Sequence, residues 1–230
     1  MTAIDNSDRY LGENNDFCQF PQFLESFRLL HTNIQLLSSY HPMRSFVMTS
    51  AMPGDGKSTI SFYLEQIAAA MGKKVFLVDT DLRQPNIHNI SLVKNIWGLI
   101  NLISSNTPHK QQLIQQMPSR NFSIMTAGQR PPDPTKLLTS EKMRGLMKEF
   151  KHDYDLVIYD TLPIFGLADA SLLTPNTDGI VLVTRMEKTD REAIQQTIDN
   201  LRMSRANIFG MLINDHNNSF NDYYSKYYYH

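Results

Sequence analysis

The apolar positions of the chain gather into short runs that are separated by longer amphipathic stretches. Six short runs predict strands, at Arg44–Ser50, Lys74–Asp79, Phe122–Ala127, Leu156–Asp160, Gly179–Thr184 and Ile208–Asn214. Two of them, Leu156–Asp160 and Gly179–Thr184, lack polar alternation, which is typical of parallel strands covered on both faces. The pattern therefore predicts a sheet that is buried on both sides.

Helical periodicity marks the stretches between the strands. Apolar residues recur at spacings of three and four from Phe23 to Leu37, which predicts a helix over Gln22–Ser39 behind Pro21. Further helices are predicted at Ser58–Met71 (closed by Gly72 at the C′ position), Gly98–Ser104, Lys110–Gln116, Ser140–Lys151 and Thr189–Ser204. Loops are expected at Thr80–Asn95 and at the proline-rich Gly128–Pro134. This alternation predicts an α/β fold with a doubly wound, mostly parallel sheet, whose ligands bind beyond the carboxyl ends of the strands.

The length of 230 residues suits one α/β domain, which we assign to residues 21–214. Residues 1–20 are polar and are expected to form a flexible lead, and residues 215–230 a mobile tail. A net charge of -1 gives no bulk basic field for nucleic acid. The single cysteine, Cys18, excludes an internal disulfide, and neither a signal peptide nor a membrane span is recognisable. These features favour a cytoplasmic protein.

One segment carries a specific phosphate-binding pattern. The sequence SAMPGDGKST (Ser50–Thr59, the phosphate loop) stands between a predicted strand and a predicted helix, as a Walker A motif requires. Its usual first glycine is Ala51 here, the smallest possible change. Backbone N–H groups of the loop and the helix N-terminus can bind a phosphate, Lys57 can reach the β- and γ-phosphates, and Ser58 can bind Mg²⁺. We assign ATP binding to Pro53, Gly54, Asp55, Gly56, Lys57, Ser58 and Thr59, with Asn214 as a weaker candidate for contact with the adenine base.

Carboxylates follow two other predicted strands. Asp79 and Asp81 end the second strand in VDTDLR, and Asp160 ends the fourth in IYDT. Both sites lie at the edge of the sheet that carries the phosphate loop, and carboxylate oxygens suit Mg²⁺. A lone Asp at a strand end is usually a turn or a helix cap, but three of them beside a phosphate loop indicate a metal–nucleotide site.

The last eight residues, YYSKYYYH, hold five of the ten tyrosines: Tyr223, Tyr224, Tyr227, Tyr228 and Tyr229. Exposed aromatic residues at a free chain end are a liability unless they serve a purpose. One interpretation is an aromatic segment that packs on the body or on a partner. The other is a set of phosphate acceptors attached to an ATP-cleaving domain.

Taken together, these motifs resemble those of the bacterial tyrosine kinases (BY-kinases) that regulate capsule and exopolysaccharide export. The resemblance runs from about Phe23 to His230 and includes SAMPGDGKST (Walker A), VFLVDTDLRQP (Walker A′), YDLVIYDTLP (Walker B), AGQRPPDPTKLLTS and the tyrosine tail. It implies an ATP-dependent tyrosine autokinase with catalytic residues Lys57, Asp79, Asp81 and Asp160. Ser58, Asp81 and Asp160 would hold Mg²⁺, and Asp79 would accept the proton of the tyrosine hydroxyl.

The resemblance also implies partners. Members of this family form rings in which the tail of one subunit enters the site of the next, and the ring contact uses Glu-x-x-Arg-x-x-Arg on an early helix. Here that pattern reads Glu25, Arg28 and His31, so the second arginine is replaced by a residue that is mostly neutral at pH 7. An activating membrane protein of polysaccharide export, separate or fused, and a tyrosine phosphatase are the other implied partners, which would place the kinase at the inner face of the plasma membrane.

Two other classes of protein remain possible from the residues. A partition- or division-site ATPase shares the fold, but its additional lysine in the phosphate loop is Met52 here, and the tyrosine tail has no role in that class. An inactive nucleotide-binding scaffold of a polysaccharide machine is the second alternative, against which the intact Lys57 and the three aspartates argue.

Overall fold

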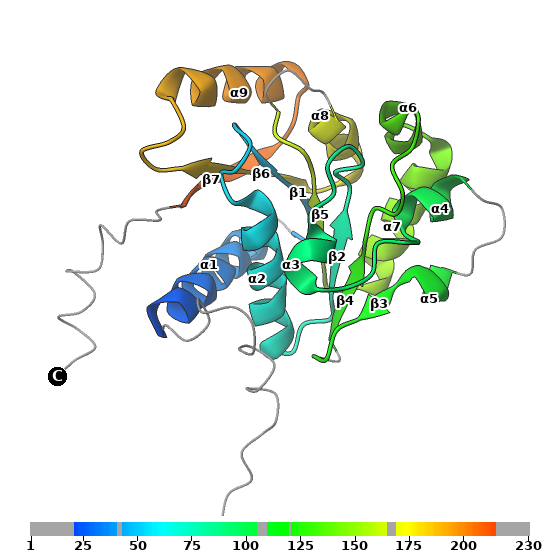
Figure 1. Ribbon diagram of the computed structural model, residues 1–230. Coiled ribbons are helices and arrows are strands. Elements are labelled where there is room, and N and C mark those ends of the chain that lie inside the picture. Colours follow the sequence, from blue (N-terminus) through cyan, green and yellow to red (C-terminus); the bar gives the residue numbers. More distant parts are fainter. Residues whose placement is uncertain (1–20, 41–42, 105–109, 120, 165–168, 215–230) are drawn as a thin grey trace, which may run out of the picture.

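The computed structural model describes residues 21–40, 43–104, 110–119, 121–164 and 169–214. The predicted lead and the tyrosine tail lie outside the described residues. Within the described part, seven strands form one sheet in the order β3-β4-β2-β5-β1-β6-β7 (Figure 1). The strands are β1 (Ser45–Ser50), β2 (Val75–Asp79), β3 (Gln115–Gln116), β4 (Phe122–Met125), β5 (Leu156–Asp160), β6 (Gly179–Arg185) and β7 (Ile208–Asn214). All neighbouring strands are parallel except β3 and β4.

Helices cover both faces of the sheet, as the doubly wound prediction requires. One hydrophobic core lies under α1 (Pro21–Tyr40), α2 (Lys57–Ala70) and α3 (Ile87–Ser91). The other lies under α4 (Leu99–Ser104), α5 (Lys110–Leu113), α6 (Pro134–Leu138), α7 (Glu141–Asp153), α8 (Asp169–Leu173) and α9 (Arg191–Met203), with a 3₁₀ turn at Thr174–Asn176. Strands β1, β2, β4 and β5 are buried at every position, which explains why apolar residues predominate in them without polar alternation.

Local signals explain where several helices begin and end. Pro21 is the first residue of α1, as predicted. Gly72, at φ +87°, follows the C-cap of α2, and its N–H bonds the carbonyl of Ala69, which confirms the predicted C′ glycine. The Ser140 hydroxyl accepts a hydrogen bond from the Met143 N–H and so caps α7.

The sequence-based elements were wrong in four places. The predicted helix Lys110–Gln116 stops at Leu113, and Gln115–Gln116 pairs with β4 as a short antiparallel strand. The predicted loop Thr80–Asn95 contains α3, and two further short helices, α6 and α8, were not foreseen. These helices have four or five residues, too few to show a hydrophobic period.

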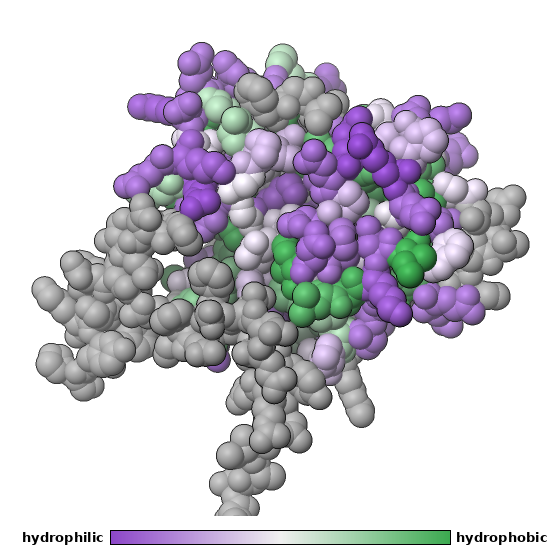
Figure 2. All heavy atoms as spheres, in the orientation of Figure 1, coloured by the Kyte–Doolittle hydropathy of each residue, from purple (hydrophilic) through white to green (hydrophobic). Residues whose placement is uncertain are grey.

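The surface carries one group of exposed hydrophobic side chains just after α3: Leu92, Ile96 and Trp97 are 74%, 54% and 64% exposed. Hydrophobic side chains gather in Figure 2 at the position that α3 occupies in Figure 1. Among the described helices, none is long and apolar enough to cross a membrane.

Candidate functional site: a phosphate loop with three strand-end aspartates

The phosphate loop joins β1 to α2, so the N-terminus of α2 begins at the loop itself. Gly54 and Gly56 have φ values of +81° and +98°, which residues with a Cβ atom rarely adopt. A Cβ on Gly56 would lie 2.4 Å from Nδ2 of Asn214, so β7 also leaves no space for a side chain there. Ala51 is fully buried, and Pro53, Gly54 and Thr59 are exposed. The loop therefore survives the replacement of its usual first glycine.

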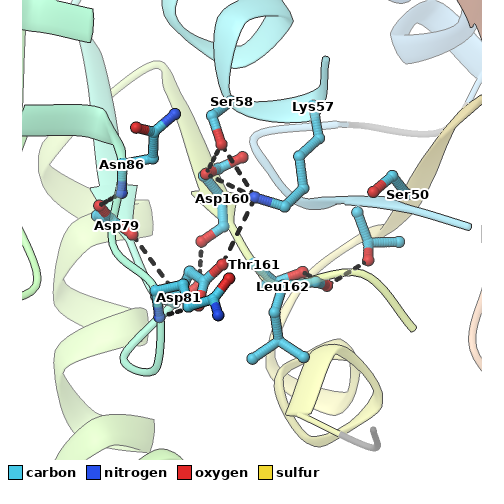
Figure 3. A network of polar contacts seen from close by, with 12 residues as sticks. Ser50, Lys57, Ser58, Asp79, Asp81, Asn86, Asp160, Thr161 and Leu162 are labelled. Carbon is cyan, nitrogen blue, oxygen red and sulfur yellow. Dashed lines mark hydrogen bonds and ion pairs between the residues drawn. The ribbon is translucent and has the colours of Figure 1, made fainter. Parts of the chain in front are cut away.

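Lys57 and Ser58, from the first turn of α2, meet Asp160 at the end of β5 (Figure 3). The Ser58 hydroxyl donates to Oδ2 of Asp160 at 2.6 Å, and Lys57 Nζ lies 3.4 Å from the same oxygen. Nζ also lies 2.9 Å from Ser58 Oγ and 3.7 Å from Oδ2 of Asp81. The lysine ammonium is thus surrounded by oxygens of the three residues that were predicted to hold Mg²⁺.

Asp79, the last residue of β2, and Asp81, two residues further on, have different surroundings. Asp81 is 4% exposed and has an oxygen that faces Lys57, while its other oxygen accepts from the Gln84 N–H at 2.9 Å. Asp79 is fully buried, and its two oxygens accept from the backbone N–H groups of Asp81, Asn86 and Ile87 at 3.1–3.2 Å. Asp79 therefore binds the N-terminus of α3 and is buried from solvent. Its assignment as proton acceptor stays a prediction.

The charges of the site strongly influence one another. Burial opposes the charge of Lys57, but Asp160, Asp81 and Asp79 outweigh it and raise the pKa of the ammonium. Burial raises the pKa of Asp160, against the lowering effect of Lys57 and Ser58. Burial and the neighbouring Asp160 hold the pKa of Asp79 well above its usual range. The site is therefore a buried cluster in which the charge of Lys57 opposes that of the aspartates.

The donor set fits Mg²⁺. This ion uses few protein ligands, keeps several waters and prefers hydroxyl and carboxylate oxygens. Ser58 Oγ, Asp160 and Asp81 supply such oxygens around a position where a cationic nitrogen now lies. The described residues contain no cluster of three or more His, Cys, Asp or Glu side chains that could hold a metal ion by themselves.

Residues from the turn after β6 and from the end of β7 hold the other side of the phosphate loop. Asp55 is fully buried and accepts from the Met52 N–H at 2.9 Å and from the Thr189 hydroxyl at 2.7 Å. Asn214 Nδ2 donates to the Asp55 carbonyl at 2.9 Å. Asn214 was predicted to contact the adenine base, and the structure places it against the backbone of the loop, where it fixes the Asp55–Gly56 peptide.

Two hydroxyl groups of the site escaped the sequence analysis. Ser61, one turn after Lys57, donates to Oδ1 of Asp160 at 3.2 Å. Thr189 lies far along the chain, in the turn between β6 and α9. The spacing Lys57–Ser61 on a predicted helix was available as a signal, but no local pattern connects Thr189 to a loop that lies more than a hundred residues earlier.

The predicted oligomer contact on α1 needs one correction. The side chains of Glu25 and Arg28 are 47% and 60% exposed and form an ion pair at 3.6 Å. His31, by contrast, is 2% exposed and faces the core, and burial and the nearby Lys73 lower its pKa. Two steps of three residues turn by about 120° around a helix, so His31 does not share the face of Glu25. Leu29 and Leu36, which do share it, are 50% and 59% exposed.

Known proteins resemble this chain over most of its length. Residues 43–211 match the family model described as an AAA domain. The chain is 36% identical over 190 residues to the tyrosine-protein kinase YwqD of Bacillus subtilis, which covers 83% of this chain and 80% of that protein. It is 30% identical over 206 residues to the putative tyrosine-protein kinase CapB of Staphylococcus aureus, which covers 88% and 90%, respectively.

Solved structures give the same relationship. The kinase domain of the Escherichia coli tyrosine kinase ETK aligns with a TM-score of 0.82 at 28% identity and covers 90% of this chain and 84% of that chain. The chimerical protein CapA2B2 aligns with a TM-score of 0.80 at 28% identity and covers 93% and 91%. The septum site-determining protein MinD of Pyrococcus horikoshii, in complex with Mg-ADP, has a TM-score of 0.63 at 22% identity over 76% of this chain and 72% of that chain, a likeness of fold alone.

Proposed function

Because the chain belongs to the bacterial tyrosine kinase family, and is therefore a protein-tyrosine kinase, we propose that it phosphorylates the tyrosines of its own C-terminal tail. The proposed acceptors are Tyr223, Tyr224, Tyr227, Tyr228 and Tyr229. One observation supports this proposal most. At the carboxyl edge of the sheet, side-chain nitrogen and oxygen atoms of Lys57, Ser58, Asp81 and Asp160 contact one another at distances of up to 3.7 Å. These residues would form the nucleotide site, and the same chain carries the tyrosine cluster that would accept the phosphate.

The proposed reaction is a phosphoryl transfer. The tyrosine oxygen forms a bond to the γ-phosphorus of ATP while the bond from that phosphorus to the bridging oxygen of the β-phosphate breaks, and ADP leaves. The phenolic proton passes to a carboxylate at the end of β2, for which Asp79 is the proposed acceptor. Lys57 and the N–H groups of the loop bind the phosphates, and Ser58, Asp81 and Asp160 would hold Mg²⁺, which neutralises phosphate charge when bound.

Lys57 has two positions in this proposal. In the structure its ammonium lies among Ser58, Asp81 and Asp160. With MgATP bound, those oxygens would hold the divalent cation, and the Lys57 ammonium would contact the phosphates in place of the carboxylates. The exchange keeps the buried carboxylates neutralised in both states, as their burial demands.

We further propose that the transfer takes place between subunits of a homo-oligomer, such as a ring. The exposed face of α1 supports this, because the Glu25–Arg28 pair lies on it together with the exposed Leu29 and Leu36. Each added phosphate brings about two negative charges, so a heavily phosphorylated tail is repelled by its own phosphates and by the acidic site. Phosphorylation would then release the tails and change the assembly.

The proposed biological role is regulation of exopolysaccharide or capsule synthesis. A relative from Klebsiella pneumoniae is named a putative tyrosine-protein kinase in the cps region. On this basis we propose a membrane activator of the polysaccharide machinery, separate or fused, and a cognate tyrosine phosphatase as partners. The kinase would act at the inner face of the plasma membrane, through that activator or through a membrane segment outside this chain.

The test is tandem mass spectrometry of the C-terminal peptide after the purified chain is incubated with MgATP. We expect phosphate on Tyr223–Tyr229 in the wild type and none in Lys57→Met. A mixture distinguishes transfer between subunits: Lys57→Met with an intact tail is combined with an active chain whose five tail tyrosines are Phe. Phosphate on the Lys57→Met tail supports transfer between subunits, and its absence there contradicts it. A wild type that binds ATP but stays unmodified contradicts the autokinase proposal for this chain and favours a nucleotide-binding scaffold.

A further inference from the structure

A lysine from outside the phosphate loop lies against it. Lys188 is exposed and stands in the turn between β6 and α9. Its Nζ donates to the carbonyl of Pro53 at 3.1 Å. A Cβ atom on Gly54 would lie only 2.6 Å from that nitrogen, so the ammonium is in direct contact with the backbone of the loop. The sequence motif of the loop gives no indication of this second cation.

Thr189, the residue after Lys188, connects this turn to the phosphate loop by hydrogen bonds. The Thr189 hydroxyl donates to Oδ1 of Asp55 at 2.7 Å and accepts from the Arg185 N–H at 3.2 Å. Asp55 in turn accepts from the Met52 N–H within the loop. The backbone at Lys188 is thus held in a defined position over the loop. A lysine held in this way loses less rotamer freedom on binding a ligand than an ordinary surface lysine.

Within the described residues, the ammonium of Lys188 forms no ion pair with a carboxylate. In the described part of the chain, the ion pairs of the site join Lys57 to Asp81 and Asp160, and no ion pair involves Lys188. Its hydrogen-bond partner is a neutral carbonyl. A phosphate chain offers a much stronger partner, because hydrogen bonds between ionised groups are shorter and roughly twice as strong as neutral ones.

The strand order indicates which phosphates Lys188 can reach. Around the loop the order is β5-β1-β6-β7, so Asp160 of β5 lies on one side of the loop, and Lys188 and Asn214 lie on the other. In the proposed function the γ-phosphate and Mg²⁺ lie on the carboxylate side. Building on that function, we propose that Lys188 binds the part of the phosphate chain that ADP and ATP share, on the side away from the carboxylates.

The test compares nucleotide affinity rather than catalysis. Isothermal titration of the full-length chain with MgADP, and with Mg²⁺ and a non-hydrolysable ATP analogue, gives Kd for both ligands. We expect Lys188→Met to raise both values about ten-fold, the loss of one charge-assisted contact. Lys188→Arg should stay near the wild type. Lys148→Met, the same change at an exposed lysine on α7, is the matched control and should change neither Kd.

A structural role for Lys188 makes a different prediction. Gln can donate a hydrogen bond to the Pro53 carbonyl but carries no charge, so Lys188→Gln should restore affinity if the lysine only shapes the loop. That result overturns the proposal, as do Met and Gln variants that bind both nucleotides within about two-fold of the wild type. A loss confined to the ATP analogue also contradicts it, since it would place the contact at the γ-phosphate. If the wild type binds both nucleotides but leaves its tail unmodified, the autokinase proposal fails while the assignment of Lys188 stands.

Discussion

Removing the charge of Lys57 should destabilise the nucleotide-free protein, and by an amount that depends on pH. Lys57→Met keeps an unbranched apolar stem of similar length and deletes the ammonium that now lies between Asp160 and Asp81. Those carboxylates are 0% and 4% exposed and cannot recruit bulk water in its place. The substitution therefore leaves buried negative charge without its cation.

The magnitude follows from the two contacts. At an effective dielectric constant of about 20, an ammonium and a carboxylate attract by about 5 kcal/mol at the 3.4 Å from Asp160, and slightly less at the 3.7 Å from Asp81. Desolvation of the lysine offsets much of this sum. Removal of one partner from a buried ion pair typically costs about 3–5 kcal/mol, which we expect for Lys57→Met near pH 8.

Protonation reduces the loss at lower pH. Burial already raises the pKa of Asp160 and Asp79, and Lys57 works against that rise, so its removal raises both values further. A carboxyl group whose pKa is higher in the folded state binds more protons when folded, so the free energy of unfolding falls as pH increases through that range. As the pH is lowered, more of the Asp160 and Asp79 carboxyls of the variant are protonated, so the loss should shrink toward about 1 kcal/mol, the value of an ordinary hydrogen bond.

Urea denaturation between pH 5 and 8, in EDTA and without nucleotide, measures this difference. The wild type, Lys57→Met, Asp160→Asn and the double variant form a cycle that isolates the coupling between the two side chains. We expect Asp160→Asn to recover part of the stability that Lys57→Met loses at pH 8. An equal loss at pH 5 and pH 8, or a coupling energy below about 0.5 kcal/mol, refutes the reasoning that Lys57 neutralises the buried carboxylates.

Two other substitutions test separate parts of the structure. Gly56→Ala should lower the free energy of unfolding by at least about 1–2 kcal/mol and abolish nucleotide binding, because φ is +98° and the new methyl group would meet Asn214. Gly145 is exposed on α7 and has open space around it. Gly145→Ala should therefore raise the free energy of unfolding by about 0.5–1 kcal/mol in the same urea titration. Burial holds the pKa of Glu65 on α2 well above its usual range, so the stability of the wild type falls as the pH rises through that pKa. Glu65→Gln should remove this part of the pH dependence and be the more stable form at pH 9. Thermal melts measure this, and an unchanged pH profile in the variant would contradict the assignment.

Much of this protein is determined by local sequence. The strands β1, β2, β5 and β6 are recognisable because parallel strands covered on both faces are rich in apolar residues and lack polar alternation. The phosphate loop is recognisable because its glycines are required by backbone angles that other residues avoid. Asp79, Asp81 and Asp160 could be grouped from sequence since all parallel strands end at the same edge of the sheet.

Contacts between distant segments were decided only by the tertiary structure. The packing of helices and turns, which no local period encodes, decides three features of the protein. It turns His31 inward, brings Asp79 to the N-terminus of α3, and places Lys188 over Gly54. Lys188 lies 135 residues from Pro53 along the chain, and only the neighbouring positions of β1 and β6 bring the two together. The sequence specifies the chemical groups and the edge at which they gather, whereas the order of the strands sets which of them touch.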